Sequence, residues 1–250
     1  MKRSAHGPHL LEVPAKTEPR AATPPVGSVT VDVRSLQHEL RRSTEAEIRF
    51  SDGDRAMYST GGSNYRQLPI GVVIPRSVDD VVEAVRVCRE HEAPILPRGG
   101  ATSLAGQCCN VAVVIDFSKY LNRALDIDPG ARLARVQPGL ILDHLRDPAE
   151  QQYQLTFGPD PSTHDHCTFG GMIGNNSCGV RSVMAQFSGP GPRMSHNVHE
   201  LEVLLYDGRR LRVGKGTSGD PDIDARLVRA PRLAQSERPE GDPLGRHLHE

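Results

Sequence analysis

The chain has 250 residues, and its 30 Lys and Arg residues nearly balance its 31 Asp and Glu residues, giving a formal net charge of −1. This balance offers no electrostatic reason to expect a nucleic-acid or anionic-membrane partner. No apolar run approaches the ~18 residues that suggest a membrane-spanning helix. The first residues also lack the apolar stretch of a secretory signal.

The five cysteines are odd in number and include no C-x-x-C pair, which argues against a disulfide framework and favours a reducing cytoplasm. Apolar residues make up 37% of the chain, and Trp is absent. Because this is lean for a core of 250 residues, we expect part of the chain to remain unpacked.

The N-terminal part begins with a proline-rich stretch, residues 1–28, which predicts a flexible tail. A lead-in segment, residues 29–64, follows. Within it, residues 31–42 have the spacing of a helix that buries Leu36 and Leu40, and residues 50–60 read as a loop.

A strand–helix–strand unit follows the lead-in. Residues 71–75 read as a buried strand, and Ser77 and Asp80 have the spacing of a helix capping box. Apolar residues then recur at helical spacing as far as Cys88, which we therefore assign to the core. A second strand begins at Pro94. This βαβ unit leads into a glycine-rich segment, where ligands of α/β sheets usually lie.

Further elements follow that segment. Residues 111–116 and 132–136 read as strands, and residues 140–146 as a helix. We expect the helix to break at Pro148, which lacks a backbone N–H, and Asp147 to cap a second short helix.

The C-terminal part contains one clear hairpin, residues 201–213, with Asp207 and Gly208 as its turn. The apolar pattern stops after Gly214. We expect residues 65–214 to form the main domain and residues 215–250 to be a charged, disordered tail.

The glycine-rich segment, residues 97–106, combines three glycines with several small residues. Glycine reaches positive φ at little steric cost, so consecutive N–H groups can point into one concavity that suits a phosphate or diphosphate. Thr102 and Ser103 add hydroxyl donors, and Arg98 adds a fixed positive charge. An isolated glycine pair would more often be only a tight turn.

Two further segments rich in small residues, 157–163 and 168–179, strengthen the ligand interpretation, since several such segments suit an extended dinucleotide. The segment 168–179 could be only a packed turn. Its four glycines beside Asn175, Asn176 and Ser177 favour contact with a cofactor.

Three other patterns carry less weight. Residues 214–219 match G-x-G-x-x-G, but no apolar helix follows, so we reject a nicotinamide site. His164-Asp165-His166 could suggest a metal, yet no third ligand lies near in sequence, and two polar loop histidines are the simpler interpretation. Cys108 and Cys109 precede an apolar strand, which favours buried structural thiols over thiol chemistry.

Residues 97–110 and 157–179 together resemble the FAD-binding domain of the vanillyl-alcohol oxidase / p-cresol methylhydroxylase superfamily. They are most similar to the branch of FAD-linked D-lactate and D-2-hydroxyglutarate dehydrogenases, which are often fused to an iron–sulfur module. The resemblance covers about residues 51–214. The chain departs from the family pattern at Ala101, where a third glycine is usual, and at Gly61, where an acidic residue is usual.

The resemblance implies an α+β fold of two subdomains that binds FAD non-covalently. A small N-terminal subdomain contains the βαβ unit, and a larger mixed-sheet subdomain follows, which we expect to be incomplete here. The cofactor-binding residues that it implies are Pro97, Arg98, Gly99, Gly100, Ala101, Thr102, Ser103, Gly106, Gln107, Pro159, Asp160, Thr163, Gly170, Gly171, Gly174, Asn175, Asn176, Ser177, Gly179 and Val198.

The activity implied is that of a flavin-dependent oxidoreductase that moves a hydride from C2 of a D-2-hydroxy acid (D-lactate, D-2-hydroxyglutarate or glycolate) to flavin N5. In the family the substrate groups lie mostly in a cap domain that follows, so we name no catalytic residue and no metal ligand. A partner chain could supply the cap or an iron–sulfur module. Two alternatives remain open: a non-catalytic FAD-binding or interaction subunit, and the flavin subunit of a multi-component oxidoreductase such as the molybdenum hydroxylases.

Overall fold

The structure, a computed structural model, describes residues 31–179, 182 and 191–214. Both expected tails, residues 1–28 and 215–250, lie outside these residues. So does the part of the G-x-G-x-x-G match that follows Gly214. Among the residues described, no helix is long and apolar enough to cross a membrane.

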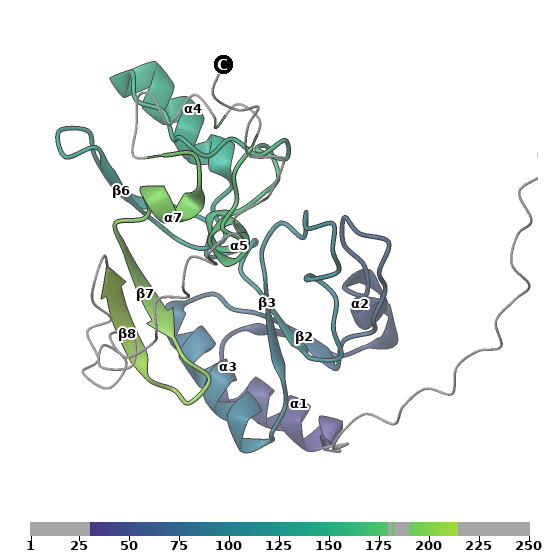
Figure 1. The fold of residues 1–250 in the computed structure, drawn as a ribbon. Coiled ribbons are helices and arrows are strands. Elements are labelled where there is room, and N and C mark those ends of the chain that lie inside the picture. The colour runs from purple at the N-terminus through teal and green to yellow at the C-terminus, as the bar shows by residue number, and fades with distance from the viewer. Residues whose placement is uncertain (1–30, 180–181, 183–190, 215–250) are drawn as a thin grey trace, which may run out of the picture. The chain divides into compact units, whose positions relative to one another are not determined.

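A four-stranded sheet organises the first part of the chain (Figure 1). Its order is β1 (Glu47–Arg49), β2 (Gly71–Ile74), β4 (Val113–Asp116) and β3 (Ile95–Arg98). β2 and β3 both run parallel to β4, whereas β1 is antiparallel to β2. Helix α3 (Val78–Glu90) connects β2 to β3, so the predicted βαβ unit is present, with β4 inserted between its two strands.

Two helices cover one face of this sheet. α1 (Val33–Ser43) buries Leu36 and Leu40 as predicted, and α3 buries Cys88. Alternation along β2 and β4 sends successive side chains to opposite faces. The core under the helices contains Leu36, Leu40, Val73, Ala84, Val85, Val87, Cys88, Ala93, Val113 and Ile115. Burial in this core raises the pKa of the Cys88 thiol to about 12, so the thiol is inert.

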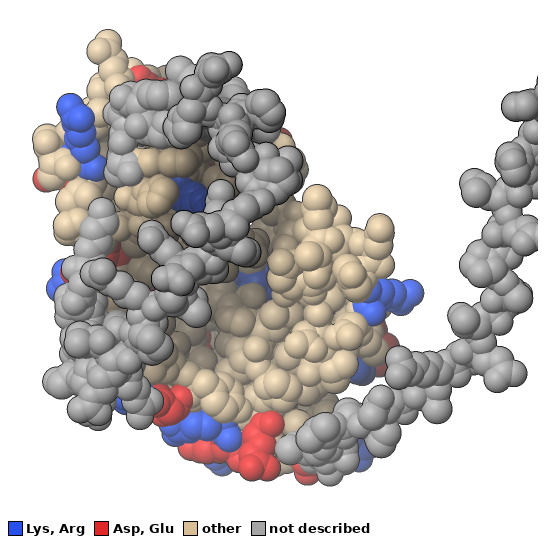
Figure 2. Space-filling model, in the orientation of Figure 1, with Lys and Arg blue, Asp and Glu red and all other residues tan. Residues whose placement is uncertain are grey.

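The outer surface of α1 and α3 carries charges of both signs, which Figure 2 shows along the lower edge of the molecule. Arg86 alone contacts Glu83, Glu90 and Glu39. Because these charges pair with one another, the surface of the two helices presents no large field of a single sign.

The structure contradicts the prediction of a loop over residues 50–60, which contain helix α2 (Asp52–Met57). Ser51 caps this helix, and its Oγ accepts a hydrogen bond from the Asp54 N–H at 3.2 Å. The two aspartates in the first turn favour a helix N-terminus. Without an apolar face, a helix this short leaves no periodic signal in the sequence.

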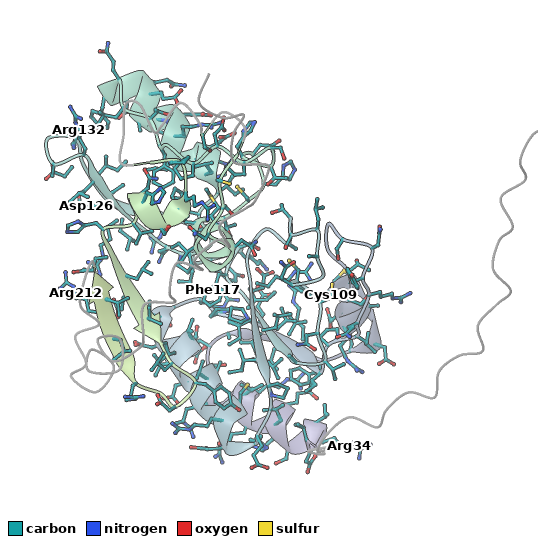
Figure 3. All side chains as sticks on the ribbon, in the orientation of Figure 1. Arg34, Cys109, Phe117, Asp126, Arg132 and Arg212 are labelled. Carbon is teal, nitrogen blue, oxygen red and sulfur yellow. The ribbon has the colours of Figure 1, made fainter. Side chains whose placement is uncertain are left out.

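The next element pair is an antiparallel hairpin of β5 (Ala124–Asp128) and β6 (Leu133–Val136). Figure 3 marks Asp126 on β5 and Arg132 at the turn before β6. The sequence predicted β6 but not β5, because four of the five β5 residues are exposed and two of the five are acidic.

Helix α4 (Leu142–Tyr153) continues through Pro148, so the predicted break was wrong. Proline removes the hydrogen bond to the carbonyl of residue 144 and costs about 3 kcal/mol in a helix interior. His144 is exposed, so water can satisfy its carbonyl. Burial of Leu142 and Leu145 anchors the first turns, and the helix ends at Gln154 with a φ of +56°.

The remaining elements are α5 (Phe169–Asn175), α7 (Met194–Asn197) and the predicted hairpin, β7 (Glu200–Leu204) with β8 (Arg210–Gly214). Its Asp-Gly turn is confirmed, with Gly208 at a φ of +90°. In this second part the described strands form two antiparallel pairs, not one larger mixed sheet. A second core joins α4, α5 and α7 through Leu140, Leu142, Leu145, Cys167, Phe169, Met172 and Met194.

Asp80 connects the start of α3 to the lead-in segment. As predicted, Ser77 Oγ accepts from the Asp80 N–H at 3.1 Å, and the buried Asp80 carboxylate accepts from the Ser77 N–H at 3.2 Å. The same carboxylate also accepts from the N–H groups of Arg76 (2.9 Å) and Glu45 (2.8 Å).

Replacing Asp80 with alanine should lower the free energy of unfolding by about 3 kcal/mol, because up to three backbone donors lose their acceptor. Urea unfolding measures the change. The neighbouring exposed residue supplies the control, Asp79→Ala, which should change stability by less than about 0.5 kcal/mol. Equal effects of the two substitutions would contradict this role of Asp80.

Glu47 on β1 is surrounded by cationic and hydroxyl donors, and only 18% of its side chain is exposed. Hydrogen bonds from Lys119, Tyr120 and Arg49 hold the pKa of the Glu47 carboxyl at about 2, against an ordinary value of 4.5. A lowered pKa in the folded state stabilises the fold above the ordinary value. That stabilisation is lost as the pH falls from 4.5 toward 2.

The substitution Glu47→Gln should therefore cost about 1 kcal/mol at pH 7, after allowance for solvent screening. The difference from the parent should shrink when chemical unfolding is repeated at pH 3. A difference that is independent of pH would contradict the stabilising role of the charge.

Candidate functional site

The glycine-rich segment lies where the parallel strands β3 and β4 reach their carboxyl ends. The structure moves its start: β3 continues to Arg98, so Pro97 and Arg98 are strand residues, and the first loop comprises residues 99–106. The N–H of Phe117, which follows β4 and is labelled in Figure 3, donates to the Arg98 carbonyl at 3.1 Å. The hydrogen bonding between β3 and β4 therefore continues up to the first loop.

The backbone amides of the first loop are its main chemical feature. The N–H groups of residues 99–103 donate no hydrogen bond to any residue that the structure describes. Ala101, in the middle of this run, has a φ of +54°. A left-handed residue within a run of free amides can turn neighbouring N–H groups into one concavity that binds an anion.

Gly99 and Gly100 are required by packing. A Cβ on Gly99 would overlap Thr168 Oγ1, and a Cβ on Gly100 would overlap the carbonyl oxygen of His166. The sequence interpretation, that these glycines keep side chains away from a ligand, is thus incomplete. They let the first loop pack directly on residues 166–168, which lie between the segment 157–163 and helix α5.

Arg98, the residue before the first loop, holds backbone carbonyls that lie outside the loop. Its guanidinium donates to the carbonyls of Tyr58 (3.0 Å), Thr60 (2.8 Å) and Cys108 (3.2 Å), and it lies 5.1 Å from the centre of the Tyr58 ring. These bonds use both terminal nitrogens. The predicted phosphate contact of Arg98 therefore has to share a guanidinium that already holds three backbone carbonyls.

The second loop, residues 157–163, is held by helix α4. Arg146 bridges Asp143 on its own helix and Asp160 in the loop, at 2.6 and 2.5 Å. Its side chain is only 13% exposed. Asp143 also pairs with His164 Nδ1 at 2.6 Å. The loop is thus fixed by charge-assisted bonds from one helix.

The His-Asp-His motif fits this structural role. His164 is paired with Asp143, and His166 with Asp165 at 2.6 Å. Within residues 31–179, 182 and 191–214, no group of three His, Cys, Asp or Glu side chains is placed to hold a metal ion.

Helix α5 begins directly after residues 166–168, on which the first loop packs, and part of its backbone is open. The N–H groups of its first residues are already used, with Phe169 bonded to Leu140 O and Gly170 to Pro138 O. Farther along, a Cβ on Gly174 would meet none of the described residues within 4 Å. A Cβ on Gly171 would meet only Thr168 Oγ1, at 3.4 Å.

Packing within the described residues therefore does not explain why these two positions are glycine. Each glycine in a helix costs about 1 kcal/mol relative to alanine. Gly171 and Gly174, spaced i and i+3, lie on the same side of α5. A bare backbone strip beside unpaired amides is the feature expected where a ligand approaches closely.

Other predicted site residues also fill structural roles. Gly170 packs on Pro138, and Gly179 on the Asp160 backbone. Gly106 has a φ of +82° and packs on the Tyr65 ring. In the second loop, Pro159 is buried and the Thr163 carbonyl accepts from the N–H of Cys167. Ser103 contacts Gln107. Asn175 and Ser177 flank Asn176, the C-cap of α5, and Val198 packs on the second core.

Sequence reasoning missed Tyr58 and Asp116. The Tyr58 hydroxyl donates to the buried Asp116 carboxylate at 2.6 Å, at the carboxyl end of β4. Burial and then this carboxylate raise the pKa of Tyr58. The two residues lie 58 positions apart in the chain, so no local pattern could have paired them.

All five cysteines are free thiols. Cys109, labelled in Figure 3, and Cys167 are buried, Cys108 is half-buried, and Cys178 is exposed. Burial raises the pKa of Cys167. The interpretation of Cys108 and Cys109 as buried structural thiols therefore holds fully for Cys109 and in part for Cys108.

Comparisons with known proteins agree with this geometry. Residues 69–214 match a family described as FAD binding domain. The chain is 36% identical over 190 residues to the glycolate oxidase subunit GlcD of Bacillus subtilis (strain 168), an alignment covering 74% of this chain and 38% of that protein. It is 34% identical over 165 residues to the D-2-hydroxyglutarate dehydrogenase of Escherichia coli (strain K12), covering 63% and 16%. The chain thus spans well under half of these relatives.

Solved structures show the same fold at low sequence identity. Alkyldihydroxyacetonephosphate synthase matches with a TM-score of 0.62 and 19% identity, over 74% of this chain and 39% of that one. p-Cresol methylhydroxylase with substrate bound matches with a TM-score of 0.60 and 20% identity, over 75% and 36%. With more than half of its residues matched, the chain belongs to the FAD binding domain family and has the fold of the vanillyl-alcohol oxidase / p-cresol methylhydroxylase superfamily.

Proposed function

We propose that this chain binds FAD non-covalently through the first loop and the open face of α5, as the FAD-binding portion of a flavin-dependent oxidoreductase that acts on D-2-hydroxy acids. One observation carries the proposal. Five consecutive amides, those of residues 99–103, have no partner among the described residues, and they lie beside a helix whose Gly171 and Gly174 leave its backbone bare.

Different groups of the chain contribute to binding the cofactor. Loop amides are suited to the diphosphate, since oriented N–H groups bind anions without a side-chain charge. The hydroxyls of Thr102 and Ser103 can add donors. Residues 166–168, which lead from the second loop into α5, pack against the first loop. The other site residues predicted from the sequence belong to this proposal, with Arg98 acting mainly on the backbone carbonyls of Tyr58, Thr60 and Cys108.

The bound cofactor supplies two-electron redox chemistry, and the protein binds and orients it. The substrate class follows from the relatives: glycolate and D-2-hydroxyglutarate, which their names print, are both 2-hydroxy acids. We place the FAD-binding domain at residues 65–214 and the protein in the cytoplasm. A cap or an iron–sulfur module from a partner chain would complete the substrate site and the path for electrons.

The substitution Gly174→Ala tests the proposal directly. The methyl group has room in the protein and favours the helix, so thermal stability should stay equal or rise. FAD should bind at least about tenfold more weakly, a loss of about 1.4 kcal/mol. Titration of the flavin-free protein, followed by flavin fluorescence, measures the affinity.

The matched control is Gly53→Ala, at another helical glycine with free space around its Cα, on α2. This variant should keep the parent affinity for FAD. Unchanged affinity in Gly174→Ala would show that the open face of α5 does not contact the cofactor.

A second substitution, Arg98→Lys, separates the two roles of Arg98. Lysine keeps the charge, but one ammonium group cannot reproduce a planar guanidinium held on three carbonyls. We expect the free energy of unfolding to fall by about 2 kcal/mol and FAD affinity to fall with it, by an amount independent of salt concentration. Retention of both properties would mean that Arg98 acts only through its charge.

A further inference from the structure

We propose that residues 58–62, which precede the residues matched to the FAD binding domain family, form the positioning segment of the first loop. This segment holds Ala101 in its left-handed conformation and thereby sets the direction in which the loop amides point. The proposal rests on FAD binding at the first loop and adds to it a specific role for a part of the chain outside the matched domain.

The segment is fixed to the sheet by side chains at the ends of β3 and β4. Arg98, at the end of β3, donates to the carbonyls of Tyr58 and Thr60, and the Tyr58 hydroxyl donates to Asp116, at the end of β4. The carbonyl of Ser59 accepts from the Gln67 N–H at 3.0 Å, and Ser59 is buried. The segment is therefore a rigid support.

One hydrogen bond joins this support to the loop. The Gly62 N–H donates to the Ala101 carbonyl at 2.8 Å. The Ala101 carbonyl and the Thr102 N–H belong to one planar trans peptide and point in opposite directions. Fixing the carbonyl toward Gly62 therefore turns the Thr102 N–H away from the positioning segment.

Ala101 needs such a restraint because its conformation is unfavourable. A residue with a side chain loses about 1–2 kcal/mol in the left-handed region. Without the bond from Gly62, the peptide could relax to negative φ, and the amides of Ala101 and Thr102 would change direction. The strain at Ala101 is thus offset by contacts of the positioning segment.

Gly61 makes the close approach possible. A Cβ at this position would lie 3.0 Å from the Ala101 carbonyl oxygen, 3.2 Å from Cys108 Cβ and 3.6 Å from Ala101 Cβ. Two of these three contacts are with Ala101 itself. A side chain at 61 would press on the carbonyl that Gly62 holds and force the loop to shift.

The test compares FAD dissociation constants of the variants Gly61→Ala and Ala101→Gly and of the double variant. Gly61→Ala should weaken FAD binding at least tenfold. Ala101→Gly alone should leave the affinity within about threefold of the parent or tighten it, since glycine accepts positive φ without strain. In the double variant, the lost methyl and the freer backbone at 101 should restore most of the affinity.

Gly130→Ala is the matched control, because it also adds a methyl to a crowded loop glycine, 3.3 Å from Asp128 Oδ1 in the β5–β6 turn, away from the first loop. It should change neither the affinity for FAD nor the amide exchange of the positioning segment. Strictly additive effects of the two substitutions at 61 and 101 would overturn the proposal, since a shared loop geometry requires coupling.

Amide hydrogen exchange of the flavin-free protein separates this proposal from the proposed function. Exchange of the Gly62 N–H, which is bonded to the Ala101 carbonyl, should be faster relative to its intrinsic rate in Gly61→Ala than in Gly130→Ala. Tyr58→Phe, which removes only a hydroxyl, should change exchange and affinity in the same direction by a smaller factor. If the parent binds no FAD, the proposed function fails, whereas unchanged exchange of the Gly62 N–H in both Gly61→Ala and Tyr58→Phe overturns the positioning role alone.

Discussion

The close approach of Gly100 to the backbone of His166 and Cys167, with Gly99 against the Thr168 side chain, is the contact on which the rest of the site depends. It joins the end of the parallel sheet to the start of α5, and the first loop contributes no side chain to the contact. Because the contact leaves no room for a Cβ at Gly99 or Gly100, a small displacement of either segment would move both the loop amides and the bare face of the helix. The site is therefore built from backbone geometry more than from side-chain charge.

The described glycines of the predicted cofactor site fall into two physical classes. Gly99, Gly100, Gly170 and Gly179 have neighbours that would collide with any Cβ, so they serve packing. Gly171 and Gly174 have almost none among the described residues, and a helix would be more stable with alanine there. Only the second class requires something outside the described residues to explain it, so these two glycines add to the unpaired amides of the first loop as support for a bound ligand.

Local patterns predicted much of the fold. The capping box of Ser77 and Asp80, the continuous apolar run of β2 and the Asp-Gly turn before β8 are short-range signals, and each is confirmed. β5 escaped prediction because it is polar and exposed. The helix break at Pro148 was wrong because burial of Leu142 and Leu145 outweighs one lost hydrogen bond.

The sequence predicted which loops form the site, but it did not predict the contacts that hold these loops in place. The resemblance identified the loops, while the roles of Tyr58, Asp116 and Arg146 depend on contacts between distant parts of the chain. Gly61 and Ala101, the two departures from the family pattern, proved to be neighbours in space. Sequence spacing could not show that contact, since 40 positions separate the two residues.

A crystal structure of the chain with FAD bound would test the central claim most directly. The account predicts that the diphosphate oxygens lie within hydrogen-bonding distance of the amides of residues 99–103 and that the cofactor covers the bare backbone at Gly171 and Gly174. A diphosphate bound elsewhere, with that face of α5 left uncovered, would contradict it.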